Sequence, residues 1–366
     1  MRSNYLKWLI LTVLTLVAAT AIINWAVDPF RYYHAPWIDI GYSENQRYQN
    51  AGLVRTEDYD TVLIGTSHTE HFLSADLGRS LGGRALNLSM SGSSIVEQSR
   101  LAEAVIRAGK ARRILWEINY PSFSTGERPS AVADFPQWLY RPDAETPFRY
   151  LVSWDTLKES LAAVGGRRAG ALDELHRWDR EFDFGEDRVL ANWDYMQTRW
   201  NDELRGVWRL QSTPLEQVPV LFRKYVGALV ERHPDVQFDL LLLPTSRLDY
   251  VNDFQIDVDR FDKRMALRGE VARLLRSRSQ VRAWDFQLIR PMTEELSRYK
   301  DLEHFDLETA RSIITRIGEA AEPARADDID RGTETLRVWV GHWARNLCER
   351  APARCQAYLR EALPAP

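Results

Sequence analysis

Short apolar runs alternate with segments of helical periodicity along most of the chain. Five runs rich in β-branched and aliphatic residues are bounded by turn-forming residues and predict strands at 61–65, 84–89, 112–118, 237–244 and 280–286. Apolar positions at helical spacing predict helices over 95–108, 215–231 and 258–277. Nearly continuous apolar strands that alternate with helices indicate a parallel sheet covered on both faces. We therefore expect an α/β fold with a five-stranded parallel sheet, whose sites lie at the carboxyl ends of the strands.

This alternation is interrupted between the third and fourth predicted strands. Residues 126–214 contain no convincing core strand, so we expect a mainly helical insertion. The insertion is rich in tryptophan, with Trp138, Trp154, Trp178, Trp193, Trp200 and Trp208. These side chains fit either a small core of the insertion or a surface that stacks on sugar rings, and the pattern leaves both interpretations open. After Glu319, the pattern predicts a tail of one or two amphipathic helices.

The N-terminal region contains a long stretch without charge. From Trp8 to Val27 there are 20 uncharged residues, enough to cross a hydrocarbon core as a helix. Arg2 and Lys7 precede this stretch and favour a cytoplasmic N-terminus, which places the rest of the chain on the periplasmic side of an inner membrane. Residues 19–21 also fit a signal-peptide cleavage pattern. An uncleaved anchor is favoured because the apolar run continues beyond them, and cleavage stays open as the alternative.

These patterns divide the chain into four segments. We expect an anchor over 1–27, a connecting segment over 28–59, a main α/β domain over 60–322 that carries the insertion, and a tail over 323–366. The 48 basic and 52 acidic residues are interspersed and give a formal net charge of -4. Because no long basic run is present, nucleic acid is not expected as a partner.

The only two cysteines, Cys348 and Cys355, lie close together in the tail. In an oxidising compartment they are expected to close a small loop through a disulfide bond, with two packed thiols as the alternative. A metal site there would need further ligands, and the neighbouring sequence offers none.

Polar residues and a glycine follow three successive predicted strands, whose carboxyl ends meet at one edge of a parallel sheet. Ser67 follows the first strand, Gly92 the second and Asn119 the third. The Ser67 hydroxyl suits a nucleophile, while the Gly92 N–H and the Asn119 amide suit the stabilisation of an oxyanion. Each residue also has an ordinary use, as a helix cap or a turn residue.

A nucleophilic serine needs a base, and His304 is the best candidate. Asp301 precedes it by three residues, so the carboxylate can hold one imidazole nitrogen while the other faces the serine. His68 and His71 offer a rival, because histidines three residues apart at a helix start can bind a metal in a metallohydrolase. No third ligand with recognisable spacing follows, so we expect no metal, a place for His68 beside Ser67, and a structural role for His71.

Taken in order, these residues resemble the four blocks of the SGNH (GDSL-like) hydrolase superfamily. The stretches IGTSHT, LNLSMSGSS and DLEHF, together with one N-terminal membrane helix, are similar to its exported, membrane-anchored members, including DltD-like and alginate O-acetyltransferase-like proteins. The resemblance covers residues 60–125 and 216–320. It implies a flavodoxin-like three-layer αβα fold without a cofactor. It also implies a catalytic triad of Ser67, Asp301 and His304. The implied oxyanion hole consists of the Ser67 N–H, the Gly92 N–H and Asn119.

The resemblance further implies a serine-dependent O-acyl transferase or esterase that acts on a cell-envelope glycan, with transfer slightly favoured. A membrane acyltransferase of the MBOAT type would deliver the acyl group. Glu117 and Tyr120 occupy the places where the third block usually has a glycine and an acid, and we expect Tyr120 to border the pocket with His68. This difference keeps a catalytically inactive, anchored glycan-binding or scaffold protein open as the alternative.

Overall fold

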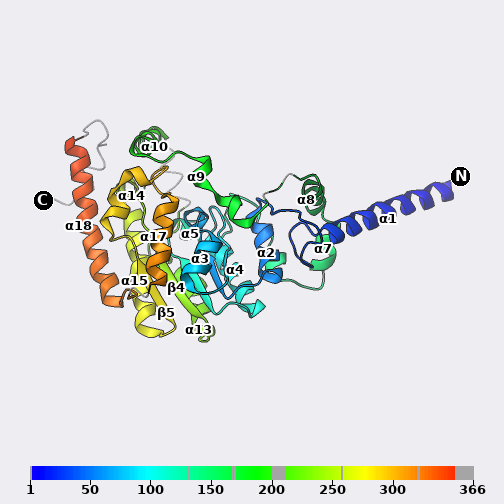
Figure 1. Ribbon diagram of the computed structural model, residues 1–366, viewed down its shortest axis with the longest axis horizontal. Coiled ribbons are helices and arrows are strands. Elements are labelled where there is room, and N and C mark those ends of the chain that lie inside the picture. The colour runs from blue at the N-terminus through cyan, green and yellow to red at the C-terminus, as the bar shows by residue number, and fades with distance from the viewer. Residues whose placement is uncertain are drawn as a thin grey trace. The chain divides into compact units, whose positions relative to one another are not determined.

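The computed structural model describes residues 2–130, 132–166, 168, 170–199, 212–256, 259–319 and 322–350. The chain forms two compact units (Figure 1). The first unit contains Met1–Asp58, Arg100–Lys110 and Asp134–His176. The second contains Tyr59–Ser99, Ala111–Ala133 and Arg177–Pro366. Every strand that the structure describes belongs to the second unit.

The second unit is built on a five-stranded, all-parallel sheet. Its strands are β1 (Thr61–Ile64), β2 (Ala85–Asn87), β3 (Arg113–Glu117), β4 (Gln237–Leu242) and β5 (Val281–Asp285), in the order β2-β1-β3-β4-β5. Each strand lies within a predicted run, so the predicted α/β fold with a five-stranded parallel sheet is confirmed. The strand order reverses at β1 and β3, and doubly wound sheets bind ligands in the crevice outside the carboxyl ends of the strands at such a point.

The helices of the second unit cover both faces of this sheet. They are η1 (Ser67–Thr69), α3 (Ser74–Leu81), α5 (Tyr120–Phe123), α9 (Trp178–Glu181), α10 (Glu186–Arg199), α12 (Gln217–Phe222), η3 (Arg223–Gly227), α13 (Ala228–Arg232), α14 (Arg247–Ile256), α15 (Arg260–Ser277), α16 (Arg290–Glu294), η4 (Leu296–Arg298), α17 (Leu307–Gly318) and α18 (Ala326–Arg350). Right-handed crossovers place the helix after β1 on one face and those after β3 and β4 on the other. In agreement, α3 packs against α17 and α12 packs against α15.

The helix α14 was not predicted by the sequence pattern. Its residues from Leu248 to Asp253 are all buried, and two aspartates are among them. Because every side of this segment is covered, it has no apolar stripe at helical spacing for sequence reasoning to detect. The predicted helix over 215–231 is found as α12, a π-helical turn and α13, and the helix predicted over 258–277 begins at Arg260.

The tail contains the long helix α18, which packs against α14 and α15. Cys348 near the end of this helix is disulfide-bonded. Cys355, the only other cysteine of the sequence, lies outside the described residues.

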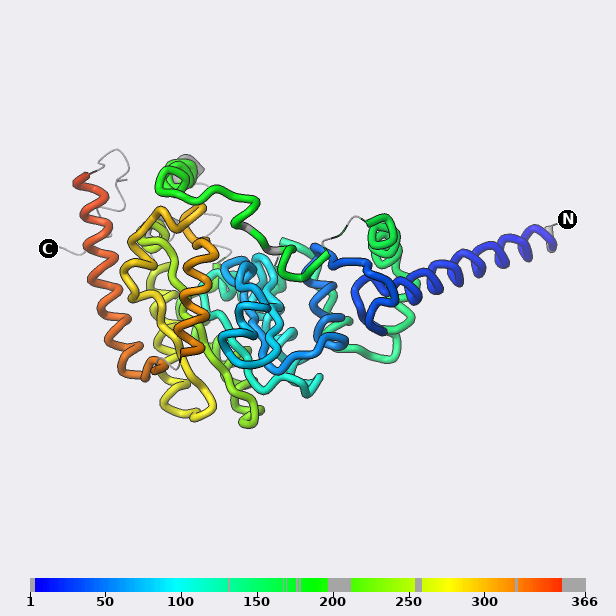
Figure 2. The backbone as a smooth tube through the Cα atoms, viewed as in Figure 1, coloured from blue at the N-terminus to red at the C-terminus, as the bar shows by residue number. Residues whose placement is uncertain are grey.

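The first unit is helical and contains the apolar N-terminal helix. Its helices are α1 (Arg2–Val27), α2 (Gln46–Thr56), α6 (Gln137–Tyr140), α7 (Thr146–Val152), α8 (Trp154–Val164) and η2 (Leu172–His176), and α4 (Ile95–Ala108) continues into it from the second unit. The segment Asn4–Val27, at the blue end of the trace in Figure 2, has a mean hydropathy of 2.2. It is long and apolar enough to cross a membrane.

The carboxyl end of α1 is fixed to the first unit by one buried amide. Asn24 donates to the carbonyl oxygens of Leu151 and Ser153 at 2.8 and 3.2 Å and accepts a hydrogen bond from the Ser160 hydroxyl at 3.0 Å. The helix runs without a break through residues 19–21, where the sequence fits a cleavage pattern. The apolar helix α1 therefore packs against α7 and α8 within the first unit.

The described part of the insertion contains helices joined by irregular segments and no strand, and its tryptophans differ in environment. Trp193 is fully buried in the core of the second unit. In the first unit, Trp138 lies under the Arg149 guanidinium at 4.9 Å and Trp154 is exposed. Trp200 and Trp208, and the side chain of Trp178, lie outside the described residues.

A buried carboxylate on β4 ties three strands together. Asp239 is fully buried and accepts hydrogen bonds from Arg282 Nε and Nη2 at 2.8 and 2.9 Å and from Trp284 Nε1 at 2.9 Å. It also accepts a hydrogen bond from Arg113 Nε on β3. One buried carboxylate thus links β3, β4 and β5, and water has no access to it as an alternative partner.

We predict that Asp239→Ala lowers the free energy of unfolding by about 1.5–3 kcal/mol, because the substitution removes the charged acceptor that Arg113, Arg282 and Trp284 share. Urea unfolding of the full chain in detergent, followed by circular dichroism, measures this change. Asp235→Ala is the matched control, because Asp235 is exposed just before β4. Equal stability of the two variants would contradict the structural role of Asp239.

Candidate active site

Ser67 lies directly beyond the carboxyl end of β1, at the first position of the short turn η1. Thr66 precedes it as the cap of this turn, and its Oγ1 accepts a hydrogen bond from His68 N at 3.4 Å. Ser67 is therefore not the capping residue. Its hydroxyl instead lies 2.8 Å from His304 Nε2.

The other imidazole nitrogen of His304 faces Asp301. His304 Nδ1 lies 2.7 Å from Asp301 Oδ2 and 2.9 Å from Oδ1. Burial opposes ionisation of Asp301, but the hydrogen bonds and charge of His304, together with Lys300, hold the pKa of this carboxyl well below its usual range. A serine, a histidine and an ionised aspartate therefore form one hydrogen-bonded chain.

The segment that carries Asp301 and His304 is closed by its own hydrogen bonds. Lys300 N donates to His304 O at 3.1 Å, and the backbone N–H groups of Glu303 and His304 donate to Asp301 Oδ1 at 2.9 and 2.8 Å. Ser246, which follows β4, donates from its N and Oγ to Leu302 O at 3.1 and 2.7 Å. The sheet therefore fixes the position of this segment.

A second polar network holds the loop that contains Ser67. Asn87 at the end of β2 donates from Nδ2 to the carbonyl oxygens of Thr69 and Phe72 at 2.7 and 2.8 Å. Ser89 lies 2.6 Å from the hydroxyl of Thr69. The ends of β1 and β2 are thereby joined immediately behind Ser67.

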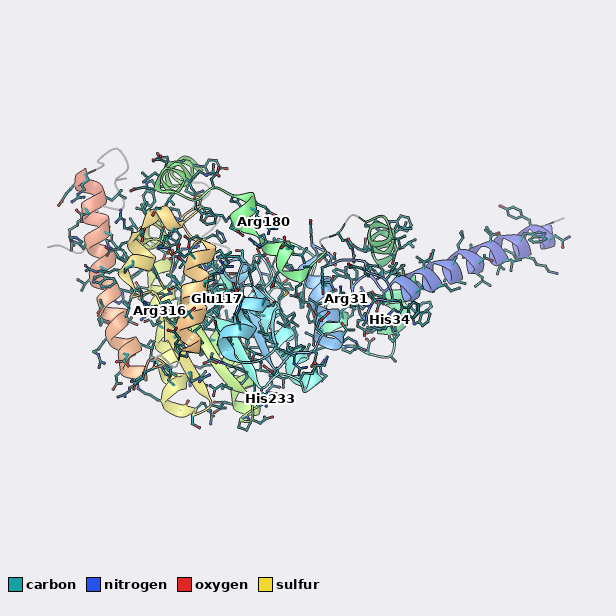
Figure 3. All side chains as sticks on the ribbon, in the orientation of Figure 1. Arg31, His34, Glu117, Arg180, His233 and Arg316 are labelled. Carbon is teal, nitrogen blue, oxygen red and sulfur yellow. The ribbon has the colours of Figure 1, made fainter. Side chains whose placement is uncertain are left out.

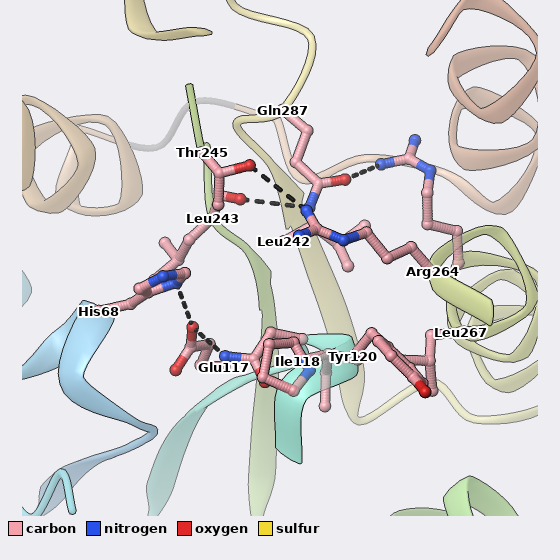
Figure 4. Close-up of a pocket in the computed structure, with 13 residues that line it drawn as sticks. His68, Glu117, Ile118, Tyr120, Leu242, Leu243, Thr245, Arg264, Leu267 and Gln287 are labelled. Carbon is pink, nitrogen blue, oxygen red and sulfur yellow. Dashed lines mark hydrogen bonds and ion pairs between the residues drawn. The ribbon is translucent and has the colours of Figure 1, made fainter. Parts of the chain in front are cut away.

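Glu117, the last residue of β3, is the centre of the site. Its carboxylate is 1% exposed and lies in the interior of the second unit (Figure 3). Oε2 accepts hydrogen bonds from Thr66 N and Oγ1 at 2.7 and 2.9 Å. Oε1 lies 2.7 Å from Asn119 Nδ2 and 3.0 Å from His68 Nδ1 (Figure 4). Burial opposes ionisation, but the hydrogen bonds and charge of His68 and the donors of Thr66 lower the pKa of this carboxyl.

The position of the Glu117 carboxylate leaves no room for a side chain at Gly65. A Cβ atom at this position would lie 2.3 Å from Thr69 Oγ1 and 2.7 Å from Glu117 Oε2, closer than nonbonded atoms approach. Any side chain there would therefore push Glu117 away from the Thr66 N–H.

Asn119 caps the helix α5 and donates a hydrogen bond to the Glu117 carboxylate. Its Oδ1 accepts hydrogen bonds from Ser122 N and Oγ at 3.1 and 2.7 Å. Its Nδ2 donates to Glu117 Oε1 at 2.7 Å and, through a longer bond of 3.2 Å, to Thr66 Oγ1. The longer hydrogen bond, from Asn119 Nδ2 to Thr66 Oγ1, is the weaker one. An oxyanion that approaches Nδ2 can therefore replace Thr66 as the acceptor of this N–H.

Gly92 lies in a turn that is fixed to the end of β1. It has a φ of +58°, and a Cβ atom there would meet the side chain of Val132 at 2.9 Å, so the position favours glycine. Met90 N and Ser93 Oγ on either side donate to Gly65 O at 3.0 and 3.2 Å. The turn is thereby held beside the loop that carries Ser67.

His68 is buried between two carboxylates. Its Nδ1 lies 3.0 Å from Glu117 Oε1 and its Nε2 lies 3.5 Å from Glu303 Oε2. Burial alone would lower the pKa of His68, but the hydrogen bonds and charges of Glu117 and Glu303 outweigh it and raise the pKa to about 10. His68 is therefore an imidazolium at neutral pH, and its ring stands edge to face with that of His304 at 5.1 Å.

His71 has a different environment from His68. Its ring packs against Phe305 at 5.2 Å, and burial lowers its pKa to about 3. Among the described residues, His68, Glu303 and His304 are the three possible metal ligands whose atoms lie within 4.8 Å of one another, and His71 is not part of this group. In this group the imidazole nitrogens are already turned toward Ser67 or toward carboxylates.

Two hollows border these residues. A cavity of about 30 Å³ is lined by residues that include Glu117, His68, Tyr120 and Arg264 (Figure 4). This volume is enough for one or two water molecules. A larger cleft of about 340 Å³ adjoins His304 and is lined by Pro121, Ser124, Asn192, Met196, Asn252, Arg260, Asp301, Leu302 and Glu303. Only the larger cleft has room for a substrate group.

Comparison with known proteins returned no match among protein-family models, curated proteins or solved structures.

The structure brings together Ser67, Asp301, His304, Asn119 and His68, as sequence reasoning placed them at one sheet edge. Sequence reasoning missed the roles of Glu117 and Glu303. Glu117 ends a strand that is otherwise apolar, and a charged residue at the carboxyl end of a buried strand was the available signal. Glu303 carried no comparable signal, because its partner His68 is distant in sequence.

We predict that His68 makes stability fall as the pH rises above neutrality. Because the pKa of His68 is about 10 in the folded chain, its stabilisation is complete below the unfolded value of about 6.5 and is lost as the pH rises toward 10. The free energy of unfolding of the full chain should therefore decrease by up to about 1.4 kcal/mol per pH unit between about pH 7 and 9.

The His68→Gln variant should lack this dependence, and His233→Gln should keep it. His233 precedes β4 at the amino end of the sheet, away from Glu117 (Figure 3). Urea titrations at a series of pH values measure the slopes. If His68→Gln and the wild type have the same slope, His68 is not a buried imidazolium.

Proposed function

We propose that this protein is a serine-dependent O-acyl transferase or esterase that works through an acyl-serine intermediate. The observation that carries the proposal is the hydrogen-bonded chain from Ser67 Oγ through His304 to Asp301. It stands where the strand order of a parallel sheet reverses, beside a cleft of about 340 Å³. A serine alone is a weak nucleophile, and a histidine oriented by a carboxylate is the arrangement that activates it.

The proposed reaction has two steps. Ser67 Oγ attacks the carbonyl carbon of an ester while His304 Nε2 takes the hydroxyl proton, and His304 then returns this proton to the departing alcohol. In the second step a glycan hydroxyl or water attacks the acyl-serine, with His304 again as base and Ser67 as the leaving group. The N–H groups of Ser67 and Gly92 and the amide of Asn119 are the donors assigned to the oxyanion of each tetrahedral intermediate.

Membership of the SGNH (GDSL-like) hydrolase superfamily is part of this proposal. Four sequence blocks in the order of that superfamily support it, as does the strand order β2-β1-β3-β4-β5, which is that of flavodoxin-like sheets. Glu117, which replaces the usual glycine of the third block, holds Asn119 by a hydrogen bond of 2.7 Å. The altered block is therefore compatible with a working site.

The apolar helix α1 supports a place for the protein in the cell envelope. A single span preceded by Arg2 and Lys7 is typical of an anchor in the cytoplasmic membrane whose following domain lies on the periplasmic side. On this basis we propose an envelope glycan as the acyl acceptor, transfer as the preferred outcome, and an MBOAT-type membrane acyltransferase as the partner that supplies the acyl group.

We predict that a fluorophosphonate probe labels the full chain on Ser67, because the probe reacts with activated serines. Labelling should be lost in Ser67→Ala, reduced at least 100-fold in His304→Ala, and unchanged in Ser277→Ala, whose hydroxyl bonds a helix carbonyl away from the site. Intact-mass spectrometry and gel fluorescence measure it. A folded wild-type chain that is neither labelled nor active would favour the inactive scaffold, and activity that chelators abolish and zinc restores would favour the metallohydrolase.

We further predict that Asp301→Asn lowers the rate of acyl-serine formation by about 10³–10⁴-fold without loss of the fold, because the amide no longer holds His304 in the required tautomer. Burst kinetics with 4-nitrophenyl acetate measure this rate. Asp306→Asn is a control for a change of charge on the same segment, since Asp306 caps α17. Equal losses in both variants would show that Asp301 has no special role.

A further inference from the structure

The cleft beside His304 is lined by a buried amide whose oxygen has no hydrogen-bond partner among the described residues. Asn252 lies in the helix α14 and is 2% exposed, yet it lines the cleft of about 340 Å³. Its carboxamide oxygen has no hydrogen-bond partner among the described residues. A buried acceptor left unpaired costs about 1–3 kcal/mol, and such groups are rare in folded proteins. The amide therefore points to a ligand that completes its hydrogen bonds.

The chemistry of a carboxamide narrows the choice of ligand. One carboxamide offers an acceptor oxygen and two N–H donors side by side. A hydroxyl group matches the unpaired oxygen, since it donates a hydrogen bond to Oδ1 while its own oxygen can accept from another group of the cleft. Asn192 places a second carboxamide on the lining of the same cleft, and Met196 and Leu302 add apolar surface for the face of a ring.

The charges of the lining argue against an anionic ligand. Arg260 is the only cation among the lining residues that the structure describes, and its Nε donates to Asp253 Oδ1 at 2.7 Å. Asp301 and Glu303 both contribute carboxylates. Because Arg260 is paired with Asp253, while Asp301 and Glu303 have their own partners in His304 and His68, the described lining offers no cation left to neutralise a carboxylate on the ligand, and burying that charge unpaired is costly.

We propose that Asn252 belongs to an acceptor subsite that binds a neutral carbohydrate and directs one of its hydroxyl groups to His304. This inference rests on the proposed function, because the carbohydrate is the nucleophile of its second step. Asn252 is a specificity residue here: it holds the acceptor and takes no part in the formation of the acyl-serine. The subsite favours transfer over hydrolysis because it places a sugar hydroxyl where water would otherwise attack.

The test separates transfer from acyl-serine formation. The full chain in detergent is given 4-nitrophenyl acetate as acyl donor, with maltotetraose as the neutral probe and tetragalacturonate as the anionic probe. The ratio of O-acetylated oligosaccharide to free acetate is measured by mass spectrometry. The wild type should transfer to maltotetraose, with a ratio for tetragalacturonate at least about tenfold lower.

Asn252→Leu, which keeps the size of the side chain and removes its polar atoms, should lower the maltotetraose ratio about tenfold or more. Its rate of fluorophosphonate labelling should stay unchanged. Asn252→Ser serves as a second variant in case leucine disturbs the fold, and a similar decrease is expected. Asn346→Leu on α18, where Asn346 bonds His342 at the surface, is the matched control and should keep the wild-type ratio.

Three results would overturn the subsite. The first is an unchanged ratio in variants of Asn252 that are still labelled at Ser67. The second is equal transfer to tetragalacturonate, and the third is a labelled wild type that transfers to neither probe. Failure of the proposed function is distinguishable from all three, because the wild type would then not be labelled at all.

Discussion

The ionised carboxylate of Glu117 is the constraint on which the rest of the site depends. A buried charge of this kind is stable only when its lone pairs are satisfied, and four donors from three residues, Thr66, His68 and Asn119, do so. These donors come from the loop after β1 and from the residues just beyond β3, so one anion fixes both sides of the point where the strand order reverses. Ser67, which lies between Thr66 and His68, is therefore held on both sides.

The same charge is connected to the base through His68. The His68 imidazolium lies between Glu117 and Glu303, and Glu303 is adjacent to His304 in sequence. The loop that carries Ser67 and the segment that carries His304 thus share a chain of alternating charges that is buried at Glu117 and His68 and partly exposed at Glu303. Separating the two segments would break the contact between His68 and Glu303 and leave the buried imidazolium with Glu117 as its only carboxylate partner among the described residues. We infer that this chain preserves the 2.8 Å distance between Ser67 Oγ and His304 Nε2.

The features that sequence reasoning could find depend on local patterns. The five strands were predictable because buried parallel strands are continuous apolar runs, and the pairing of Asp301 with His304 was predictable because three residues separate them. The helix α14 and the pair His68–Glu303 were not, because α14 is buried on all sides and the pair joins residues far apart in the chain. Glu117 is the intermediate case: it was noticed as a departure from a family pattern, but its partners appear only in three dimensions.

The central claim is that Ser67 carries the acyl group, and its direct test is to trap and locate that group. The full chain is mixed with 4-nitrophenyl acetate, quenched in acid within one turnover, digested, and mapped by tandem mass spectrometry. The account predicts one acetyl ester on Ser67 that is lost when the quench is delayed. No acetylated peptide, or an acetyl group that is found on another residue and persists in Ser67→Ala, would contradict it.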